Sequence, residues 1–246
     1  MHDPTLARRV EEASLNAWPA LQQTLLDGWV LRFSRGFTKR ANSIVPLYPS
    51  QQDALDKIRY CENVYARENL KTIFRLTTVV ESAPLDRSLE ARGYARIDPT
   101  LVLVRPIERP PTIDARFIEL PRGEWLDAYV RNAELPATGA QLHALLLAGI
   151  RSEHVFGAVA ADGVPVACGL AVLECELLGL FDLVTYPSAR RRGHAHALVE
   201  SLLGWGERRG ARYTYLQVIE ANHPARALYH RLGFAELYRY WYRVAP

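Results

Sequence analysis

The sequence has few of the residues and patterns that define several common protein classes. It contains three cysteines in 246 residues, and Cys61, Cys168 and Cys175 fit neither a disulfide framework nor a metal-ligand spacing. The only lysines are Lys39, Lys57 and Lys71, so arginine carries almost all of the positive charge. No long basic tract indicates binding to nucleic acid, and we interpret most of the arginines as solvated surface. We therefore expect a reduced, cytoplasmic protein without a bound metal and without a nucleic-acid partner.

Long hydrophobic runs are also missing. The longest run, residues 144–150, is far too short to span a membrane, and residues 1–15 contain no apolar signal core. Hydrophobic residues make up 49% of the chain and charged residues 23%, which is typical of a soluble globular protein. A chain of this length can bury one large core or two modest ones. We expect no association with a membrane.

Apolar periodicity and turn signals predict helices and strands that alternate around a mixed sheet, an α/β or α+β fold. The first part of the chain has expected helices at 5–17, 51–69 and 85–91 and expected strands at 29–33, 42–47, 73–80 and 101–104. The second part has expected strands at 115–119, 155–160, 166–173, 178–185, 213–219 and 237–244, and helices at 123–133, 141–151, 195–209 and 224–232. Between the parts, three prolines in residues 104–112 can continue neither a helix nor a central strand. We therefore expect domains at 1–106 and 113–246, joined by a linker at 107–112.

Residues 186–199 (YPSARRRGHAHALV) follow an apolar strand and lead into a helix. The first N–H groups of a helix have no partner within it, and the helix dipole adds partial positive charge there. Gly193 and Ala195 leave the backbone uncovered, so a phosphate or pyrophosphate can approach these amides. The stretch has no Gly-Lys-Ser/Thr, as a P-loop would, and too few glycines for a dinucleotide fingerprint. It predicts an anion site of another kind.

Two motifs resemble those of one enzyme superfamily. Arg190-x-x-Gly193-x-Ala195 resembles the Arg/Gln-x-x-Gly-x-Gly/Ala motif of the GCN5-related N-acetyltransferase (GNAT) superfamily. About thirty residues later, NHPARALYHRLGF resembles the family pattern Asn-x-x-Ala-x-x-Leu-Tyr-x-x-Leu-Gly-Phe. The matching positions are Asn222, Ala225, Leu228, Tyr229, Leu232, Gly233 and Phe234. The motifs stand in the family's order and spacing, and the resemblance covers roughly residues 113–246.

Much of the second motif also has a purely structural reading. Asn222 and Pro224 are typical of an N-cap and the first helical turn, and Gly233 is typical of the residue that ends a helix. Leu228 and Leu232 fall on one helical face and are best explained as core residues. Tyr229 differs from these residues because a buried hydroxyl needs a partner.

The resemblance implies a GNAT fold and an enzyme that transfers acetyl from acetyl-CoA to a primary amine by direct attack in a ternary complex. It implies that the pyrophosphate is held by Arg190, Arg191, Arg192, Gly193, His194 and Ala195. It implies further contacts with the pantetheine arm and the acetyl carbonyl from Asn222, Ala225 and the backbone amides of Leu183, Val184 and Thr185. Tyr229 is expected to protonate the departing thiolate, since a phenol is neutral at pH 7 and can give up a proton as charge develops. The acceptor, a small-molecule or peptide amine, is left open.

The general base is less clear from the residues. Asp182 lies within the apolar run LGLFDLV, where an unpaired buried carboxylate would be costly. It is therefore our candidate base, with Glu174 and Glu176 as rivals. The alternative is that backbone groups or an arginine hold Asp182 at the end of the sheet.

The two parts of the chain resemble each other. Tyr-Pro-Ser occurs at 48–50 and at 186–188, 138 residues apart, and a helix ends before an aromatic residue at 92–94 and at 232–234, 140 residues apart. These landmarks indicate an internal repeat, although chance similarity between β-α-β units is the alternative.

The first copy lacks the chemistry of the second. Where the second copy has ARRRGHA, the first has QQDALDK, and Leu89 stands in place of Tyr229. We expect a degenerate GNAT-like N-terminal half that contributes packing and one wall of the substrate site.

The polar run TKRANSIVPL (residues 38–47) resembles a segment that a subset of GNAT proteins carries in a non-catalytic N-terminal half. We expect Arg40, Asn42 and Ser43 to face the acceptor, with Arg40 able to hold a carboxylate in a fork geometry. The alternative is a loop stabilised by the hydrogen bonds of its own Asn and Ser side chains.

Two other functions fit the motifs. One is a non-catalytic acyl-CoA-binding or interaction module, against which Tyr229 argues, and the other is a transferase that uses a longer acyl-CoA. The oligomeric state, monomer or homodimer, is left open because the aromatic strand at 237–244 can pack on a partner or on the N-terminal half.

Overall fold

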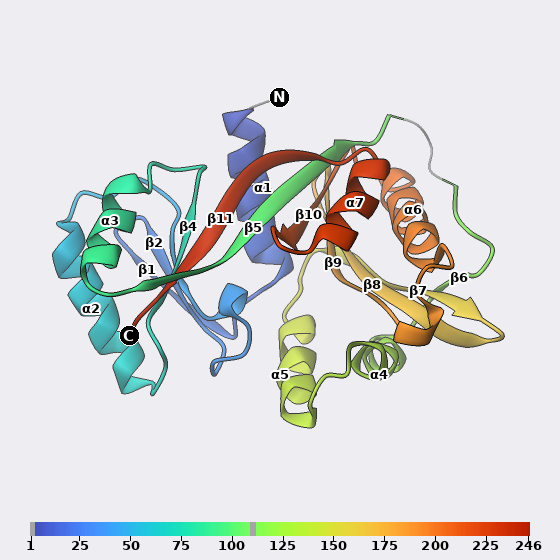
Figure 1. Ribbon diagram of the computed structural model, residues 1–246, viewed down its shortest axis with the longest axis horizontal. Coiled ribbons are helices and arrows are strands. Elements are labelled where there is room, and N and C mark those ends of the chain that lie inside the picture. Colours follow the sequence, from blue (N-terminus) through green and yellow to red (C-terminus); the bar gives the residue numbers. More distant parts are fainter. Residues whose placement is uncertain (1–2, 109–111) are drawn as a thin grey trace.

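The computed structural model describes residues 3–108 and 112–246. Residues 109–111 of the expected linker lie outside the described residues. Within the described residues, one mixed sheet of eleven strands extends across both parts of the chain, with helices on both of its faces (Figure 1). The predicted α/β fold class is confirmed. No helix in the described part of the chain combines the length and apolar character that crossing a membrane requires.

The first part of the chain holds α1 (Pro4–Ala17), β1 (Gln22–Leu26), β2 (Trp29–Phe33), η1 (Lys39–Ala41), β3 (Ile44–Pro46), α2 (Ala54–Arg67), β4 (Ile73–Thr77), α3 (Ala83–Ala91) and β5 (Ala95–Pro106). The second part holds β6 (Phe117–Glu119), α4 (Arg122–Ala133), α5 (Ala137–Ala148), β7 (Glu153–Ala161), β8 (Val164–Glu174), β9 (Leu177–Thr185), η2 (Pro187–Ala189), α6 (His194–Glu207), β10 (Tyr213–Ile219), α7 (His223–Arg231) and β11 (Ala235–Val244). Each predicted helix and strand has a counterpart here. The structure adds β1 and makes β5 much longer than expected.

The strand order is β1-β2-β3-β4-β11-β5-β10-β9-β8-β7-β6. The last strand of each half therefore lies inside the sheet of the other half: β11 pairs with β4, and β5 pairs with β10. The two long strands also pair with each other at the centre, where Figure 1 shows them crossing the molecule. From β1 inward, the pairing runs antiparallel, antiparallel, parallel, antiparallel. The same order runs inward from β7, and β6 is an additional antiparallel strand at that edge. This twofold pattern is what a duplicated unit predicts.

Alternating side chains of the C-terminal half of the sheet face two separate hydrophobic clusters. On β8, Cys168, Leu170 and Val172 contribute to the cluster under α1, α4 and α5, whereas Ala171 and Leu173 contribute to the cluster under α6 and α7. The period of two residues is that of a strand buried on both faces.

Helix α1 belongs to the first part of the chain but packs against β8 and β9 of the second. Its start is fixed by Asp3, whose Oδ1 accepts hydrogen bonds from the N–H groups of Thr5 and Leu6 at 2.9 and 3.1 Å. Its buried face includes Val10, which is fully inaccessible to solvent. Burial of such a side chain stabilises the fold by about 1.5–3 kcal/mol. The first helix thus helps to hold the two halves together.

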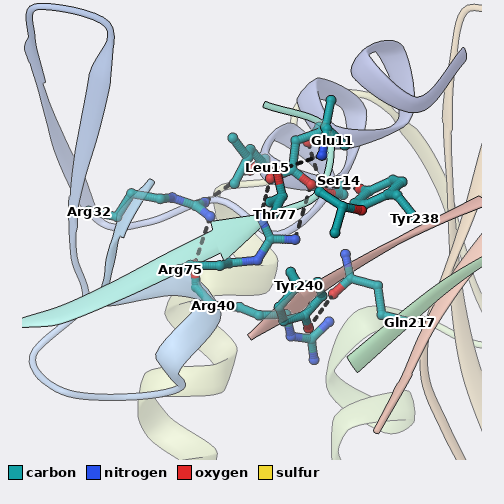
Figure 2. A network of polar contacts seen from close by, with 12 residues as sticks. Glu11, Ser14, Leu15, Arg32, Arg40, Arg75, Thr77, Gln217, Tyr238 and Tyr240 are labelled. Carbon is teal, nitrogen blue, oxygen red and sulfur yellow. Dashed lines mark hydrogen bonds and ion pairs between the residues drawn. The ribbon is translucent and has the colours of Figure 1, made fainter. Parts of the chain in front are cut away.

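A buried ionic network at the centre ties α1 to β4 and β11 (Figure 2). The Glu11 carboxylate accepts hydrogen bonds from both terminal nitrogens of Arg75 and from the Tyr238 hydroxyl. Burial acts to lower the pKa of Arg75, but the charge of Glu11 outweighs it and the pKa is raised. Removal of one partner from such a pair typically costs about 3–5 kcal/mol, because the other charge stays buried. The Arg75 guanidinium also lies 3.9 Å from the ring centroid of Tyr240.

Candidate functional site

The site forms where two parallel strands separate. β9 and β10 pair from Leu177 opposite Tyr213 to Leu180 opposite Leu216, and the pairing ends there. Just beyond, the register between β8 and β9 shifts, and Asp182 adopts a left-handed backbone conformation with φ +51°. A bulge of this kind bends a strand and redirects its side chains. Two cavities lie at the opening between the strands.

The first cavity, of about 840 Å³, lies between the end of β9, the start of α6 and helix α7. Its lining includes most of the residues predicted for the cofactor: Leu183, Val184, Thr185, Arg190, Arg191, Gly193, His194, Ala195, Asn222 and Ala225. Arg192 is exposed and lies outside this lining. The structure thus brings together two motifs that are about thirty residues apart in the sequence.

The N-terminus of α6 faces this cavity without a capping side chain. Its N-cap is Gly193, with φ +82°, a conformation that glycine adopts without steric cost. A Cβ atom on Gly193 would meet nothing within 4 Å, so the space in front of the amides is open. The Arg190 Nε donates to the Thr185 carbonyl at 3.2 Å, which fixes the arginine beside the end of β9. Free amides, a helix dipole and nearby arginines suit an anion such as a pyrophosphate.

Tyr229 lies on α7 at the point where the two cavities meet, and it lines both. Helix α7 begins where the Asn222 Oδ1 accepts a hydrogen bond from the Ala225 N–H at 3.2 Å. The Tyr229 ring is 8% exposed and packs edge-on against Phe234. Burial raises the pKa of Tyr229 to about 12, so the hydroxyl is protonated at neutral pH. A protonated hydroxyl therefore lies between the cavities.

The second cavity, of about 450 Å³, is built from both halves of the chain. Its lining from the first half includes Thr38, Lys39, Arg40, Asp98 and Thr100, and its lining from the second half includes Asp182, Leu183, Gln217, Asn222, Ala225, Tyr229, Tyr240 and Tyr242. Residues of the N-terminal half thus form one wall of this cavity. Tyr240 donates its hydroxyl proton to Gln217 Oε1 at 3.0 Å (Figure 2).

Asp182 has a partner that the sequence did not reveal. Its Oδ2 lies 2.8 Å from Nε2 of His143 on α5, and its side chain is only 6% exposed. The rival acids lie outside the lining of both cavities, where Glu174 accepts a hydrogen bond from Asn16 and Glu176 pairs with Arg9. Among the candidate bases, Asp182 alone lines a cavity in the described structure.

Of the three residues predicted to face the acceptor, Arg40 lines the second cavity. Its guanidinium lies 4.8 Å from the ring centroid of Trp18, and no carboxylate of the described residues is within salt-bridge distance of it. Asn42 and Ser43 are buried and do not line the cavity. The Asn42 Oδ1 instead accepts from the backbone N–H groups of Ser34 and Gly36, so it stabilises the loop, as the alternative interpretation held.

Arg32 fixes the position of this wall from behind. Its guanidinium donates to the Arg40 carbonyl at 2.8 Å and to the Leu15 carbonyl in the last turn of α1 (Figure 2). It also donates to the Trp18 carbonyl, just after the end of α1. Burial lowers its pKa to about 10, which still leaves it charged at neutral pH. A cation at this place suits the negative end of the helix dipole. An arginine inside the apolar strand WVLRF was the signal that could have identified it.

The fold and the site define an acetyltransferase of the GNAT superfamily. The family described as "Probable histone acetyltransferase Rv0428c C-terminal" matches residues 6–243. The chain belongs to this family.

Two curated relatives agree. The "Uncharacterized N-acetyltransferase YobR" of Bacillus subtilis is 24% identical over 249 residues, with coverage of 96% of this chain and 98% of the relative. The "Probable histone acetyltransferase Rv0428c" of Mycobacterium tuberculosis is 30% identical over 217 residues, with coverage of 86% and 65%.

Solved structures show the same fold at low identity. A GCN5-related N-acetyltransferase from Kribbella flavida has a TM-score of 0.73 at 17% identity, with coverage of 98% of this chain and 96% of that one. A GCN5-related N-acetyltransferase from Sphaerobacter thermophilus has a TM-score of 0.66 at 18% identity and coverage of 95% and 84%. A tandem GNAT protein from the clavulanic acid biosynthesis pathway has a TM-score of 0.60 at 14% identity and coverage of 79% and 70%.

Proposed function

We propose that the protein transfers the acetyl group of acetyl-CoA to a primary amine by direct attack within a ternary complex. The observation that carries this proposal is the meeting of two cavities at Tyr229. One cavity offers uncapped helix amides, and the other offers the carboxylate of Asp182. We assign catalysis to residues 113–246 and one wall of the acceptor site to residues 1–106, with 107–112 as the link.

The first cavity fits the co-substrate. The amides at the start of α6, Gly193 and the side chains of Arg190 and Arg191 would hold the pyrophosphate. The backbone of Leu183–Thr185, together with Asn222 and Ala225, would hold the pantetheine arm. We keep Arg192 as a contact at the rim. Bound acetyl-CoA supplies the activated thioester.

The residues between the cavities have complementary roles in the transfer. Asp182 takes a proton from the acceptor ammonium, which leaves a neutral amine. As the new N–C bond forms and the C–S bond breaks, Tyr229 gives its proton to the departing sulfur and regains one from the amide nitrogen. The proton on Asp182 returns to solvent, so one proton is released per turnover. Orientation of two bound substrates can lower the barrier by up to roughly 7–11 kcal/mol.

The second cavity favours an acceptor that carries a carboxylate as well as an amine. Arg40 presents a guanidinium that is stacked on Trp18 and has no acidic partner among the described residues. Asp182 presents the opposite charge within the same cavity. A related protein is named a probable histone acetyltransferase, and a protein lysine could reach Asp182 but would bring no carboxylate to Arg40. We therefore propose an amino acid or a similar zwitterion.

A panel of acceptors tests this proposal through the release of free thiol from acetyl-CoA. It pairs amino acids with the corresponding decarboxylated amines and adds a lysine-rich histone-tail peptide. We expect faster transfer to the amino acids. Arg40→Ala should raise their KM by about tenfold or more, since a hydrogen bond to a charged group contributes about 1.5–3 kcal/mol. The KM of the decarboxylated amines should not change.

Three results would contradict the proposal. Thiol release with none of the amines would exclude the transferase function under these conditions. An unchanged amino-acid KM in Arg40→Ala would remove Arg40 from the site. A clear preference for the histone-tail peptide would assign the acceptor to protein lysines.

A further inference from the structure

His143 is a buried histidine that no motif of the sequence explains. It is 2% exposed, and its Nε2 faces Asp182 Oδ2 at 2.8 Å. Its other ring nitrogen, Nδ1, is buried and has no hydrogen-bond partner among the described residues. An unsatisfied buried polar atom carries an uncompensated desolvation cost. A residue with that cost, placed beside a cavity, calls for an explanation other than packing.

Aromatic rings from three segments fix the orientation of the imidazole. The ring centroids of Trp18, Phe37, Trp125 and Tyr129 lie 5.4, 6.0, 6.3 and 4.9 Å from that of His143. Trp125 is itself held, because its Nε1 donates to the Gly157 carbonyl at 3.1 Å. The imidazole therefore has little freedom to turn away from Asp182.

The contact at 2.8 Å requires one proton between the two groups. Nδ1 has no acceptor that would hold a proton there, so the assignment that satisfies the pair places the hydrogen on Nε2 and directs it at the carboxylate. A hydrogen bond donated to a carboxylate favours its ionised form. Tyr129 on α4 is a second polar neighbour of Asp182, and Asp182 lines the second cavity, where the acceptor would bind.

We propose that His143 is a positioning residue that holds Asp182 ionised and aimed at the acceptor amine. This inference rests on the proposed function, in which Asp182 receives the ammonium proton. His143 does not touch the acceptor, because it acts through Asp182. The apolar helix α5, which otherwise reads as a packing element, thereby gains a role in the reaction.

Other charged and titratable groups face the pair from neighbouring elements. Tyr129 lies on α4, Arg40 on η1, Tyr229 on α7 and Tyr240 and Tyr242 on β11, and a Lys39–Asp98 ion pair stands at the cavity. Burial raises the pKa of Tyr129, and the charge of Asp182 raises it further while Arg40 lowers it. Burial also raises the pKa of Tyr242 and brings that of Tyr229 to about 12. These three tyrosines therefore stay protonated at acidic and neutral pH, and they do not contribute to the acid limb of a pH profile.

The test compares two substitutions of His143 in the full-length protein, with the amine that gives the fastest thiol release. His143→Leu removes the donor, and His143→Gln places an amide N–H near the position of Nε2. We expect His143→Leu to lower kcat by about 10²-fold. It should also move the acid limb of the kcat/KM profile upward by at least about one pH unit, because a buried carboxylate without a donor has a raised pKa. His143→Gln should restore most of kcat and return the acid limb toward that of the wild type.

Controls separate positioning from a general structural effect. His154→Leu changes a histidine that is only partly buried. It bonds to the Ser152 carbonyl and lines neither cavity, so its substitution should leave the pH profile unchanged. Coenzyme A affinity should be the same in wild type and His143→Leu. If His143→Leu does not fold, the comparison uses His143→Gln and Asp182→Asn, singly and combined. Because both residues act through one carboxylate, the double variant should be no slower than Asp182→Asn.

Two failures are distinguishable. If the wild type transfers acetyl but the acid limb does not move in His143→Leu, or the double variant is additive, the role of His143 is wrong and the proposed function stands. If the wild type transfers acetyl to no amine, the proposed function is wrong and the role of His143 falls with it.

Discussion

The same strand-turn-helix unit occurs twice in the molecule, and its helix N-terminus is closed in one copy and open in the other. In the first copy, the N-cap of α2 is Asp53, whose Oδ1 accepts hydrogen bonds from the N–H groups of Leu55 and Asp56 at 2.9 and 3.1 Å. In the second copy, the N-cap of α6 is Gly193, and no side chain caps the helix. The first copy satisfies these amides with its own carboxylate, and the second leaves them for a ligand.

The turn before each helix shows the same contrast. In the first copy, Asp27 accepts hydrogen bonds from the Ser50 hydroxyl, from the N–H groups of Gln51 and Gln52, and from the Lys57 ammonium. In the second copy, the corresponding turn lines the open cavity with Arg190 and Arg191. The comparison shows that the same helix N-terminus is capped by a side chain in the first copy and uncapped in the second. Function depends on whether the chain caps that N-terminus itself.

The largest expected effect concerns Tyr229, the position at which the first copy has Leu89. Tyr229→Phe should lower kcat by about 10²–10⁴-fold, as expected on loss of a general acid, with little change in coenzyme A affinity. Steady-state thiol release and equilibrium binding measure the two quantities. The matched change in the other copy, Leu89→Met, alters a fully buried residue away from both cavities and should leave kcat unchanged. An undiminished kcat in Tyr229→Phe would exclude the acid role.

The second prediction adds to α6 the N-cap carboxylate that α2 already has. Gly193→Asp places a carboxylate at the N-cap of α6, as Asp53 does at α2. We expect coenzyme A to bind more weakly by about 1.5–3 kcal/mol, roughly 10- to 150-fold in Kd, because charged hydrogen bonds to the amides are lost. Gly193→Asn is the matched control, since it tolerates the same backbone conformation without the charge and should lose less. Isothermal titration that gave wild-type affinity for Gly193→Asp would contradict the assignment of the anion site.

The third prediction removes the N-cap side chain of α2. Asp53→Ala removes the cap of α2 and should lower the free energy of unfolding by about 1 kcal/mol. Urea denaturation measures this change, and coenzyme A affinity is the control that should stay constant. If the denaturation midpoint does not move, the capping contact contributes nothing to stability.

The smallest effect is a pH dependence. The hydrogen bond from Ser50, followed by those from Gln52 and Lys57, lowers the pKa of Asp27 well below its ordinary value. A depressed pKa in the folded state means that the stabilisation is fully present above the unfolded pKa of about 3.9 and is lost as the pH falls below it. The difference in Tm between wild type and Asp27→Asn should therefore be constant near neutral pH and shrink below about pH 4. A difference that stayed constant down to pH 3 would show that Asp27 is not the titrating group.

The local parts of this site were predictable from the sequence. Three elements of the site depend only on residues close to them in the sequence: the turn after β9, the start of α6 at Gly193 and the start of α7 at Asn222. Local chemistry specifies such elements, so the predicted ends of β9, α6 and α7 lie within two residues of the observed ones. For the same reason, the motif residues around the first cavity could be named without the structure.

The parts that depend on distant residues were not predictable. Strand β1 has no apolar alternation and is mostly exposed, so pairing with β2 alone defines it. Strand β5 runs through Asp98, with φ +49°, and Pro99, which together read as a break in the sequence. His143 reads as one polar position in an apolar helix until Asp182 is placed beside it. Asn42 was assigned to the acceptor because a polar run fits a binding loop and a self-stabilised loop equally well.

The exchanged strands β5 and β11 make the chain a covalent counterpart of a strand-swapped dimer. A fragment that began at residue 113 would lack β5 and expose the edges of β10 and β11 that pair with it. A fragment that ended at residue 106 would lack β11 and leave β4 unpaired on one side. The first copy therefore cannot be removed without exposing strand edges of the second, even though it has Leu89 where the second has Tyr229. It is a structural partner that the second copy carries in its own chain.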